Sequence, residues 1–497
     1  MLDRKFAWLT SCARPFYSHD PFSNSVLINH MMKLSKFSSP NPGVFLILGL
    51  IVSITVFFIA SQSGLAFPPA FTLAITALCA VWWVSEPIPL AITSLIPIAL
   101  FPLLGILSKQ EVAQSYGHSL ILLLLGGFIL STAMESSGTH RRLAIGMVNL
   151  FGAHNSRRLV LGFLFASAML SMWISNTATT LMLLPIALAI LSGIKERDID
   201  APLLLGIGYA ASLGGIGTPI GTPPNLIFQQ VYSDTTGTEV DFLTWMSWGV
   251  PVVLLFLPIM GLWLTRHAKR SIDVELPSVG KLTSYEKRVL LVFAITALAW
   301  IFRSQPFGGW SQLLGLPQAN DASTALLAVV LMFVIPRESG SKEKLLTWEV
   351  ARTIPWRVLL LFAGGITLAS AFKTTGLSVM IGDQLSLFTA LPIIIVIALL
   401  CLAITFLTEI TSNTATTSLL MPILAAAALS AKIPPEILMA PAAMSASCAF
   451  MLPAATAPNA VVYSSDRVTI RQMAKNGLVL NLIGVVVITG ISYALMT

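Results

Sequence analysis

One polar hexapeptide, SNTATT, occurs twice in this sequence, at Ser175–Thr180 and at Ser412–Thr417, and each copy interrupts a long apolar run. Ser, Asn and Thr favour helix starts because their side-chain oxygens accept hydrogen bonds from free backbone N–H groups. A helix N-terminus favours anions, and the carbonyl groups freed at a break, with hydroxyl and amide oxygens, suit Na⁺. The two copies therefore predict two half-sites that bind an anion together with cations.

A second pair of motifs follows the hexapeptides, GTPPN at Gly221–Asn225 and ATAPN at Ala455–Asn459. Gly permits close backbone approach, and Pro removes an N–H donor and frees a carbonyl group, so both motifs indicate backbone opened inside an apolar segment. A single Ser/Thr patch in a membrane helix usually serves packing or bonds to a backbone carbonyl. Two identical copies, each followed by such a break, favour a binding role instead.

Charged residues near these motifs are scarce. No Lys or Arg lies within ten residues of either hexapeptide, so helix ends, neutral donors and bound cations must hold an anion there, which predicts cation-coupled anion transport. Glu409 precedes the second copy, and for such a costly intramembrane carboxylate two roles fit, a proton site or a structural acceptor of backbone N–H groups. We favour the structural role because the first half has no equivalent acid. Glu86 is expected near a helix end, and Glu135 and Lys373 away from the substrate.

Composition places the chain in a membrane. Of its 497 residues 55% are hydrophobic and only 10% are charged, whereas soluble chains carry about 25% charged residues. Lipid admits only helices or closed barrels, and the long apolar runs favour helices over the alternating pattern of barrel strands. The net charge of +7 comes largely from Lys and Arg in short loops. The positive-inside rule explains this charge without nucleic-acid binding, and it predicts that the loop Arg266–Lys281 is cytoplasmic.

The chain contains an internal duplication. Lys109–Gly138 resembles Thr347–Gly376 at an offset of 238, with matching EVA triplets and Gly-Gly pairs. The hexapeptides follow at an offset of 237, and the GTPPN and ATAPN motifs at 234. Duplicated halves with interrupted apolar segments at matching positions are typical of secondary transporters. The duplication alone fits either parallel or inverted halves.

The apolar runs predict the positions of the helices. Each hexapeptide is flanked by two arms, of which Leu159–Ile174 and Leu181–Ile194 are shorter than the roughly 20 residues a span needs, so they form a re-entrant hairpin or a broken helix. The amphipathic segment His140–Arg158 is expected at the membrane interface. Full spans are expected near 43–60, 69–85, 88–107, 119–138, 243–265, 287–303, 322–336, 357–376 and 475–495, the second pair of arms near 391–410 and 416–431, and broken segments at 202–231 and 435–463.

Two further observations concern the tail and the cysteines. Residues 1–40 are polar, and Met31-Met32 directly precede the first apolar run, so we hypothesise that the natural start is Met31 or Met32. The cysteines show no metal or redox spacing and are interpreted as three apolar fillers and one tail residue, namely Cys79, Cys401, Cys448 and Cys12.

The paired Ser-Asn-Thr motifs, the GTPPN and ATAPN breaks, and WWVSEPIPLAITSLIP at Trp82–Pro97 resemble the divalent anion/sodium symporter family of di- and tricarboxylate and sulfate transporters. The resemblance covers about residues 41 to 497. It implies an all-α polytopic membrane protein of about eleven transmembrane helices plus two opposed re-entrant hairpins, in an internal inverted repeat. It further implies a homodimer in the lipid bilayer, whose transport domain moves against a scaffold as an elevator.

The resemblance also assigns domains and site residues. The scaffold helices would be 41–150 and 285–389, and the transport-domain halves 151–270 and 390–497, after the tail 1–40. Na⁺, the coupling ion, would bind one site made by Ser171, Ser175, Asn176 and Gly221, and a second made by Thr408, Ser412, Asn413 and Ala455. The substrate carboxylates would meet Asn176, Thr177, Thr222, Asn413, Thr414 and Thr456.

These features predict a sodium-coupled symporter of C4-dicarboxylates such as succinate, malate and fumarate, and not an enzyme, in a bacterial inner membrane. Transport of sulfate or another inorganic oxyanion, or sodium-independent dicarboxylate exchange, are the alternatives. Some family members have Pro at the position of Ala457, and this departure bears on substrate preference. An intramembrane hydrolase is disfavoured because no His or paired carboxylates lie beside either break.

Overall fold

The computed structural model describes residues 42–152, 155–194, 197–268, 280–305, 308–377, 380 and 391–497. Within these ranges the regular elements are helices, apart from one isolated β-bridge between Pro336 and Lys344. Seven helices of this part of the chain are long and apolar enough to cross a membrane. The prediction of an all-α polytopic membrane protein is therefore confirmed, while the hypothesis on Met31 and Met32 lies outside the described residues.

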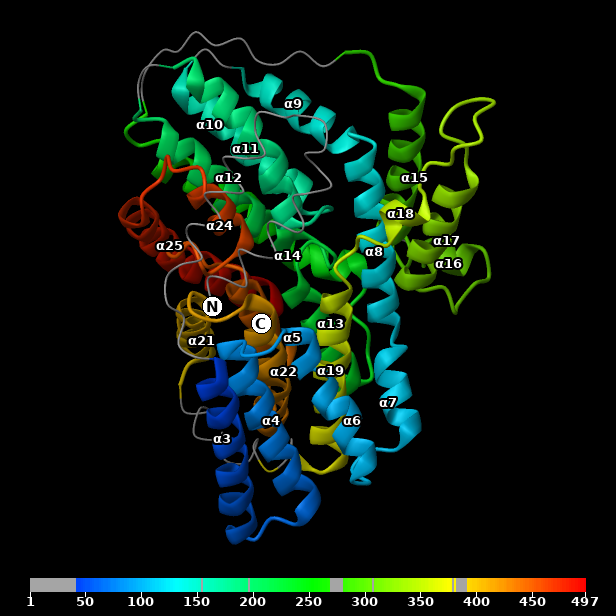
Figure 1. Ribbon diagram of the computed structural model, residues 1–497, viewed down its shortest axis with the longest axis vertical. Coiled ribbons are helices and arrows are strands. Elements are labelled where there is room, and N and C mark those ends of the chain that lie inside the picture. Colours follow the sequence, from blue (N-terminus) through cyan, green and yellow to red (C-terminus); the bar gives the residue numbers. More distant parts are fainter. Residues whose placement is uncertain are drawn as a thin grey trace.

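The first half of the duplication begins with two antiparallel neighbours, α3 and α4, which pack along each other at one end of the molecule (Figure 1). Its helices are α3 (Pro42–Gln62), α4 (Phe67–Ser85), α5 (Leu90–Thr93), α6 (Leu95–Leu103), α7 (Lys109–Tyr116), α8 (Ser119–Ser136), α9 (Thr139–Phe151), α10 (Ser156–Ser171), α11 (Asn176–Ser192), α12 (Asp200–Gly214), the 3₁₀ turn η2 (Gly215–Gly217), α13 (Pro223–Thr236) and α14 (Phe242–Leu264).

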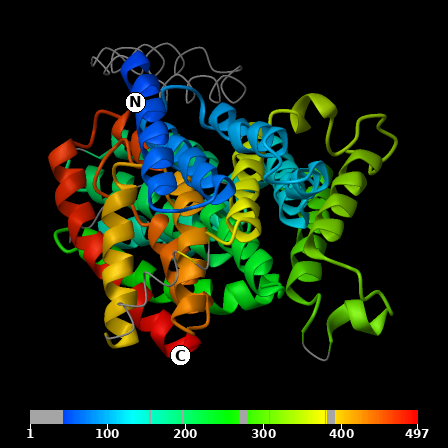
Figure 2. The same ribbon diagram turned by 90° about the horizontal axis from the view of Figure 1, so that it is seen from below.

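The second half starts with helices that stand beside α8 on one flank, where α17 packs against both α8 and α15 (Figures 1 and 2). Its helices are α15 (Ser284–Ile301), α16 (Gly309–Leu313), α17 (Asp321–Val334), α18 (Trp348–Ala351), α19 (Trp356–Thr374), α21 (Ile393–Thr408), α22 (Asn413–Ser430), α23 (Glu436–Ala446), α24 (Ala457–Tyr463) and α25 (Ile470–Met496).

The interrupted segments of the two halves pack together. Helix α12 contacts α24, α13 contacts α22 and α23, and α14 contacts α25. Their facing residues are almost wholly buried, from Leu203 to Leu213 on α12 and throughout α23. The two hexapeptides are thereby carried on one continuous apolar core.

One expected span is interrupted. The segment 88–107 forms α5 and α6, which are separated at Ser94. Ser94 Oγ donates to Leu90 O at 2.8 Å and accepts a hydrogen bond from Trp83 Nε1 at 3.1 Å. Gly364 of α19 packs on Ser94 so closely that a Cβ at position 364 would lie 2.5 Å from the Ser94 carbonyl oxygen. Pro97, which lacks the N–H that would bond Thr93 O, favours the interruption locally, and Trp83 and Gly364 pack against it.

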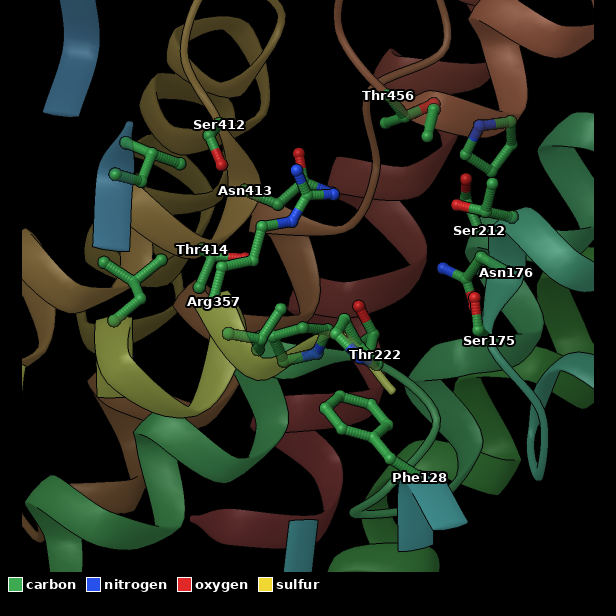
Figure 3. Close-up of a pocket in the computed structure, with 18 of the residues that line it drawn as sticks. Phe128, Ser175, Asn176, Ser212, Thr222, Arg357, Ser412, Asn413, Thr414 and Thr456 are labelled. Carbon is green, nitrogen blue, oxygen red and sulfur yellow. The ribbon is translucent and has the colours of Figure 1, made fainter. Parts of the chain in front are cut away.

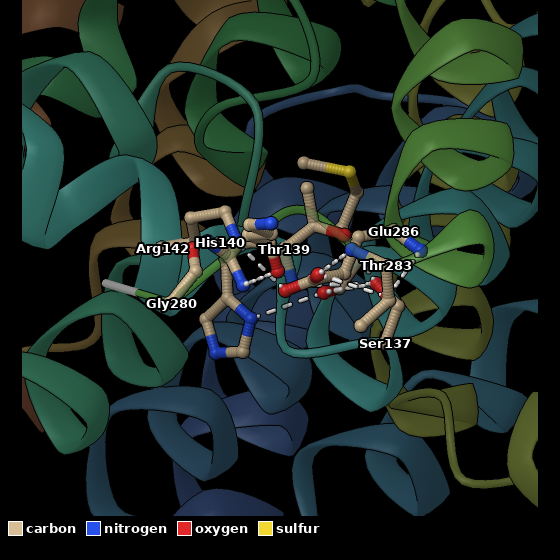
Figure 4. Close-up of polar contacts among 9 residues, drawn as sticks. Ser137, Thr139, His140, Arg142, Gly280, Thr283 and Glu286 are labelled. Carbon is tan, nitrogen blue, oxygen red and sulfur yellow. Dashed lines mark hydrogen bonds and ion pairs between the residues drawn. The ribbon is translucent and has the colours of Figure 1, made fainter.

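The amphipathic segment that follows α8 is fixed to the start of α15 (Figure 4). Arg142 of α9 contacts Glu286 at 2.8 Å and donates to the backbone carbonyls of Gly280 and Lys281. Glu286 also accepts from Thr283 N at 2.8 Å in the capping box of α15. Helix α9 ends at Phe151, so the last residues of the expected interfacial segment belong to the hairpin arm α10 instead.

Candidate functional site

Both hexapeptides begin a helix, as their composition predicts. Ser175 is the N-cap of α11, and its Oγ accepts a hydrogen bond from Ala178 N at 3.4 Å. Helix α22 begins at Asn413 in the same way, but the side chain of its N-cap, Ser412, makes no capping bond. Each helix pairs with the preceding arm, α10 or α21, to form a helical hairpin with the hexapeptide at its turn. The free N–H groups of the first helical turn are thus placed at the tip of each hairpin.

In each break, one asparagine amide donates hydrogen bonds to two backbone carbonyls. Asn225 Nδ2 donates to Gly215 O at 2.9 Å and to Thr218 O at 2.7 Å. Asn459 Nδ2 donates to Ala449 O at 2.9 Å and to Leu452 O at 3.0 Å. All three residues of one set are related to those of the other by the offset of 234. The last residue of GTPPN and ATAPN therefore holds the open backbone in shape, a role that we had not assigned to either asparagine.

The first proposed sodium site brings hydroxyl, amide and carbonyl oxygens together. The amide of Asn176 lies 2.6 Å from Ser171 Oγ, and its nitrogen, turned towards the carbonyls, lies 3.2 Å from Gly221 O and from Ala211 O. A Cβ on Gly221 would lie 2.5 Å from Gly215 O. This close approach requires glycine, as the motif predicts.

The second proposed sodium site also brings hydroxyl, amide and carbonyl oxygens together, but alanines replace two glycines of its break. Thr408 Oγ1 donates to Asn413 Oδ1 at 2.8 Å and to Ala446 O at 3.0 Å. Ala455 stands at the position that Gly221 has in the first half, and Ala449 stands at that of Gly215. The second break therefore carries two methyl groups where the first has none, so the two sites are alike but not equivalent.

One cavity of about 640 Å³ joins the two halves of the site (Figure 3). Its wall contains every residue predicted to meet the substrate carboxylates, two of which are also predicted sodium ligands, together with four further predicted sodium ligands. These residues are Asn176, Thr177, Thr222, Asn413, Thr414 and Thr456, with Ser175, Gly221, Ser412 and Ala455. The other two predicted sodium ligands, Ser171 and Thr408, are fully buried behind the hairpin tips. The cavity also has Ala457 in its wall.

Some residues of the cavity wall were not predicted. Arg357, the second residue of α19, extends into the cavity, and Glu86, the C-cap of α4, lines it as well as ending a helix. Phe128 and Ser212 are further members of the wall. One signal for Arg357 is present in the duplication, because the offset of 238 pairs this cation with an uncharged residue, Ser119.

Glu409 binds backbone N–H groups, as the structural interpretation predicts. Its carboxylate accepts from Met451 N at 2.8 Å, from Leu452 N at 3.0 Å and from Asn481 Nδ2 at 2.7 Å. The side chain is buried, and it joins the second hairpin turn to the second break and to α25. Neither Glu135 nor Lys373 lies in the cavity wall, and Lys373 Nζ donates instead to Asp234 O at 2.8 Å.

In the first half, the hairpin turn and the break are also connected by a hydrogen bond, but through different chemical groups. Thr218 Oγ1 of the break donates to Met172 O in the first hairpin turn. Met172 is the counterpart of Glu409 at the offset of 237, and Thr218 is the counterpart of Leu452 at the offset of 234. The same two positions are therefore bonded in both halves, and in both the break donates to the hairpin turn. In the first half a side chain donates to a backbone carbonyl, and in the second a backbone N–H donates to a side-chain carboxylate.

Duplicated halves, each with a hairpin and a broken helix that meet at one cavity, place the protein in the class of secondary membrane carriers. Residues 43–496 match the family described as the sodium:sulfate symporter transmembrane region. This chain belongs to that family of divalent anion/sodium symporters.

Relatives in this family include two named "Sodium-dependent dicarboxylate transporter SdcS". The protein of Staphylococcus saprophyticus is 37% identical over 476 residues, which is 91% of each chain. That of Staphylococcus aureus strain MSSA476 is 39% identical over 475 residues, which is 91% of this chain and 90% of the relative.

Two solved transporter structures share the fold. The Alcanivorax borkumensis YdaH transporter has a TM-score of 0.54 at 14% identity, over 79% of this chain and 89% of its own. Neisseria gonorrhoeae MtrF has a TM-score of 0.57 at 15% identity, over 79% of this chain and 83% of its own.

Proposed function

We propose that this protein is a sodium-coupled symporter of C4-dicarboxylates such as succinate, malate and fumarate. The observation that carries the proposal is the single cavity in which both hexapeptides and both breaks converge. Neutral amide and hydroxyl groups on its wall donate to carboxylates, and the oxygen atoms clustered at each hairpin tip suit Na⁺. The name of the staphylococcal relatives, which specifies sodium and dicarboxylate, supports the same substrate and ion.

The packing of the two halves supports a transport cycle of the elevator type. We propose that α10–α14 and α21–α25 form the transport domain, and that it moves as an elevator against a scaffold of α3–α8 and α15–α19. The mutual packing of α12 with α24 and of α14 with α25 supports a transport unit that moves as one body. The protein acts as a homodimer in the bacterial plasma membrane, with its two re-entrant hairpins in inverted orientation.

An inorganic oxyanion such as sulfate is the second candidate substrate. The description of the matching family names sulfate. Ala457, in the cavity wall, keeps a backbone N–H and lacks the ring that some members of the family have at this position. The same helix-end groups bind a tetrahedral oxyanion and a carboxylate.

Uptake into proteoliposomes tests the proposal directly. Radiolabelled succinate should accumulate under an inward Na⁺ gradient and not under an equal K⁺ gradient, and malate should compete where sulfate does not. Uptake that ignores Na⁺ and requires internal dicarboxylate would identify an exchanger instead. Absence of succinate uptake together with Na⁺-dependent sulfate uptake would establish the second candidate.

Mutation of the hexapeptides tests the site. Asn176→Ala and Asn413→Ala should each abolish uptake while leaving expression and folding intact, because each removes an amide from the cavity wall and from a proposed sodium site. Asn149→Ala, at an exposed position on α9, serves as the matched control and should transport normally. Normal uptake by either hexapeptide variant would place the site elsewhere.

A further inference from the structure

The charges in the cavity wall are unevenly placed. Among the described residues that line the cavity, Glu86 and Arg357 are the only two with ionisable side chains. Neither belongs to a hairpin or to a break. Glu86 ends α4, and Arg357 lies in the first turn of α19. The groups that both halves of the duplication contribute are neutral, so any charged side chain that meets the substrate in this conformation comes from the other helices.

We propose that Arg357 binds a substrate carboxylate in the conformation described here, and that it raises substrate affinity on one face of the membrane only. This inference rests on the proposed function, because it takes the substrate to be a dicarboxylate and α19 to be part of the scaffold. Arg357 is then a specificity-determining residue that the duplicated motifs do not include.

The position of Arg357 suits this role. Its side chain is exposed to the cavity and extends from α19 into the space bounded by Asn413 and Thr414 (Figure 3). A guanidinium group presents a planar fork of donors that matches a carboxylate, and charge-assisted bonds of this kind are stronger than bonds from neutral donors.

The sidedness follows from where the two sets of groups are anchored. Asn413 and Thr414 begin α22 at the second hairpin tip, and they travel with the substrate if the hairpins move. Arg357 is anchored on α19, which packs mainly against α5, α6 and α7 of the proposed scaffold and also contacts α13 and α22 of the proposed transport domain. An elevator displacement separates the hairpin tip from Arg357. The guanidinium therefore contributes to binding from the face to which this cavity opens and not from the other face.

Arg357→Gln tests the inference when the KM for succinate is measured from both faces of the membrane, in intact cells and in everted membrane vesicles. We expect the KM for succinate to rise about tenfold on one face and to stay unchanged on the other, as befits one lost charge-assisted contact, with kcat little altered. Arg357→Lys keeps the charge without the fork and should recover most of the affinity. Arg352→Gln, an exposed arginine of the same segment outside the cavity wall, is the matched control and should leave both KM values unchanged.

The outcomes separate this inference from the proposed function. An unchanged KM on both faces in Arg357→Gln would show that the guanidinium does not bind substrate. An equal rise on both faces would show that Arg357 acts in both conformations, which overturns the sidedness. Loss of kcat without a change in KM would assign it a structural role. Failure of the unaltered protein to take up succinate with Na⁺ would overturn the proposed function instead.

Discussion

Replacement of Glu409 separates a structural carboxylate from an ion-binding one. Its two oxygens accept three N–H donors, from Met451, Leu452 and Asn481. Glu409→Gln keeps the shape but loses one acceptor, and one buried donor left without a partner costs about 1–3 kcal/mol. Glu409→Ala leaves all three donors without a partner, which at the same cost for each amounts to about 3–9 kcal/mol.

These losses are large beside the whole stability of a typical domain, about 5–15 kcal/mol. We therefore expect the thermal unfolding midpoint of the purified protein in detergent to fall in the order wild type, Glu409→Gln, Glu409→Ala. Glu409→Gln should retain sodium-dependent uptake because its amide still holds the second break near the second hairpin turn. Glu343→Gln, at an exposed carboxylate paired with Arg337, is the control and should change neither quantity.

The structural assignment would be refuted by the reverse pattern. If Glu409→Gln unfolds at the wild-type temperature yet transports without regard to Na⁺, the carboxylate handles a cation and not the backbone. Loss of a pH dependence of uptake in Glu409→Gln, again at unchanged stability, would identify it as a proton site.

Two other predictions concern the first break and the α8–α9 corner. Gly221→Ala should impair sodium-dependent uptake, since its Cβ would lie 2.5 Å from Gly215 O, whereas Ala455→Gly, the counterpart, should be tolerated; equal uptake by the two variants would contradict this reasoning. Burial lowers the pKa of His140 from 6.5 to about 4, so its neutral form stabilises the fold. This stability is present above pH 6.5, and about 3 kcal/mol of it is lost as the pH falls towards 4. Unfolding midpoints measured across this window should therefore depend less on pH in His140→Asn than in the wild type. An unchanged pH dependence would show that His140 does not cause it.

The elements of the fold could largely be predicted from the sequence. The expected span 243–265 is observed as Phe242–Leu264, and the expected span 357–376 as Trp356–Thr374. Long apolar runs fix their own limits because polar residues are costly in lipid. The expected span 88–107 is observed as α5 and α6, which are interrupted at Ser94. Pro97 favours this interruption locally, because it lacks the N–H that would bond Thr93 O. The contacts of Ser94 with Trp83 and Gly364 come from other helices and could not be predicted from the segment itself.

Some residues of the candidate site could also be predicted from the sequence, and others could not. The residues of the hexapeptides and breaks could be identified because the duplication marks them twice, and the structure brings them to one cavity. Arg357 has no charged counterpart in the first half, because Ser119 stands at the matching position. The duplication therefore does not mark it as a site residue, and the packing of α19 places it at the cavity. Arg357 lies 55 residues before the second hexapeptide, so the residues that flank each hexapeptide in the sequence do not include it.

The bond between hairpin and break links the two segments of each half through different groups. In the first half the break contributes a side-chain donor, Thr218, to the backbone carbonyl of Met172, and in the second the hairpin contributes a side-chain acceptor, Glu409, to the backbone N–H of Leu452. A hairpin grafted alone from the first half into the second would carry Met172 and leave buried N–H groups of the second break without an acceptor. Each hairpin is therefore matched to its own break, and an exchange of hairpins between the halves would need the matching break to be transferred as well.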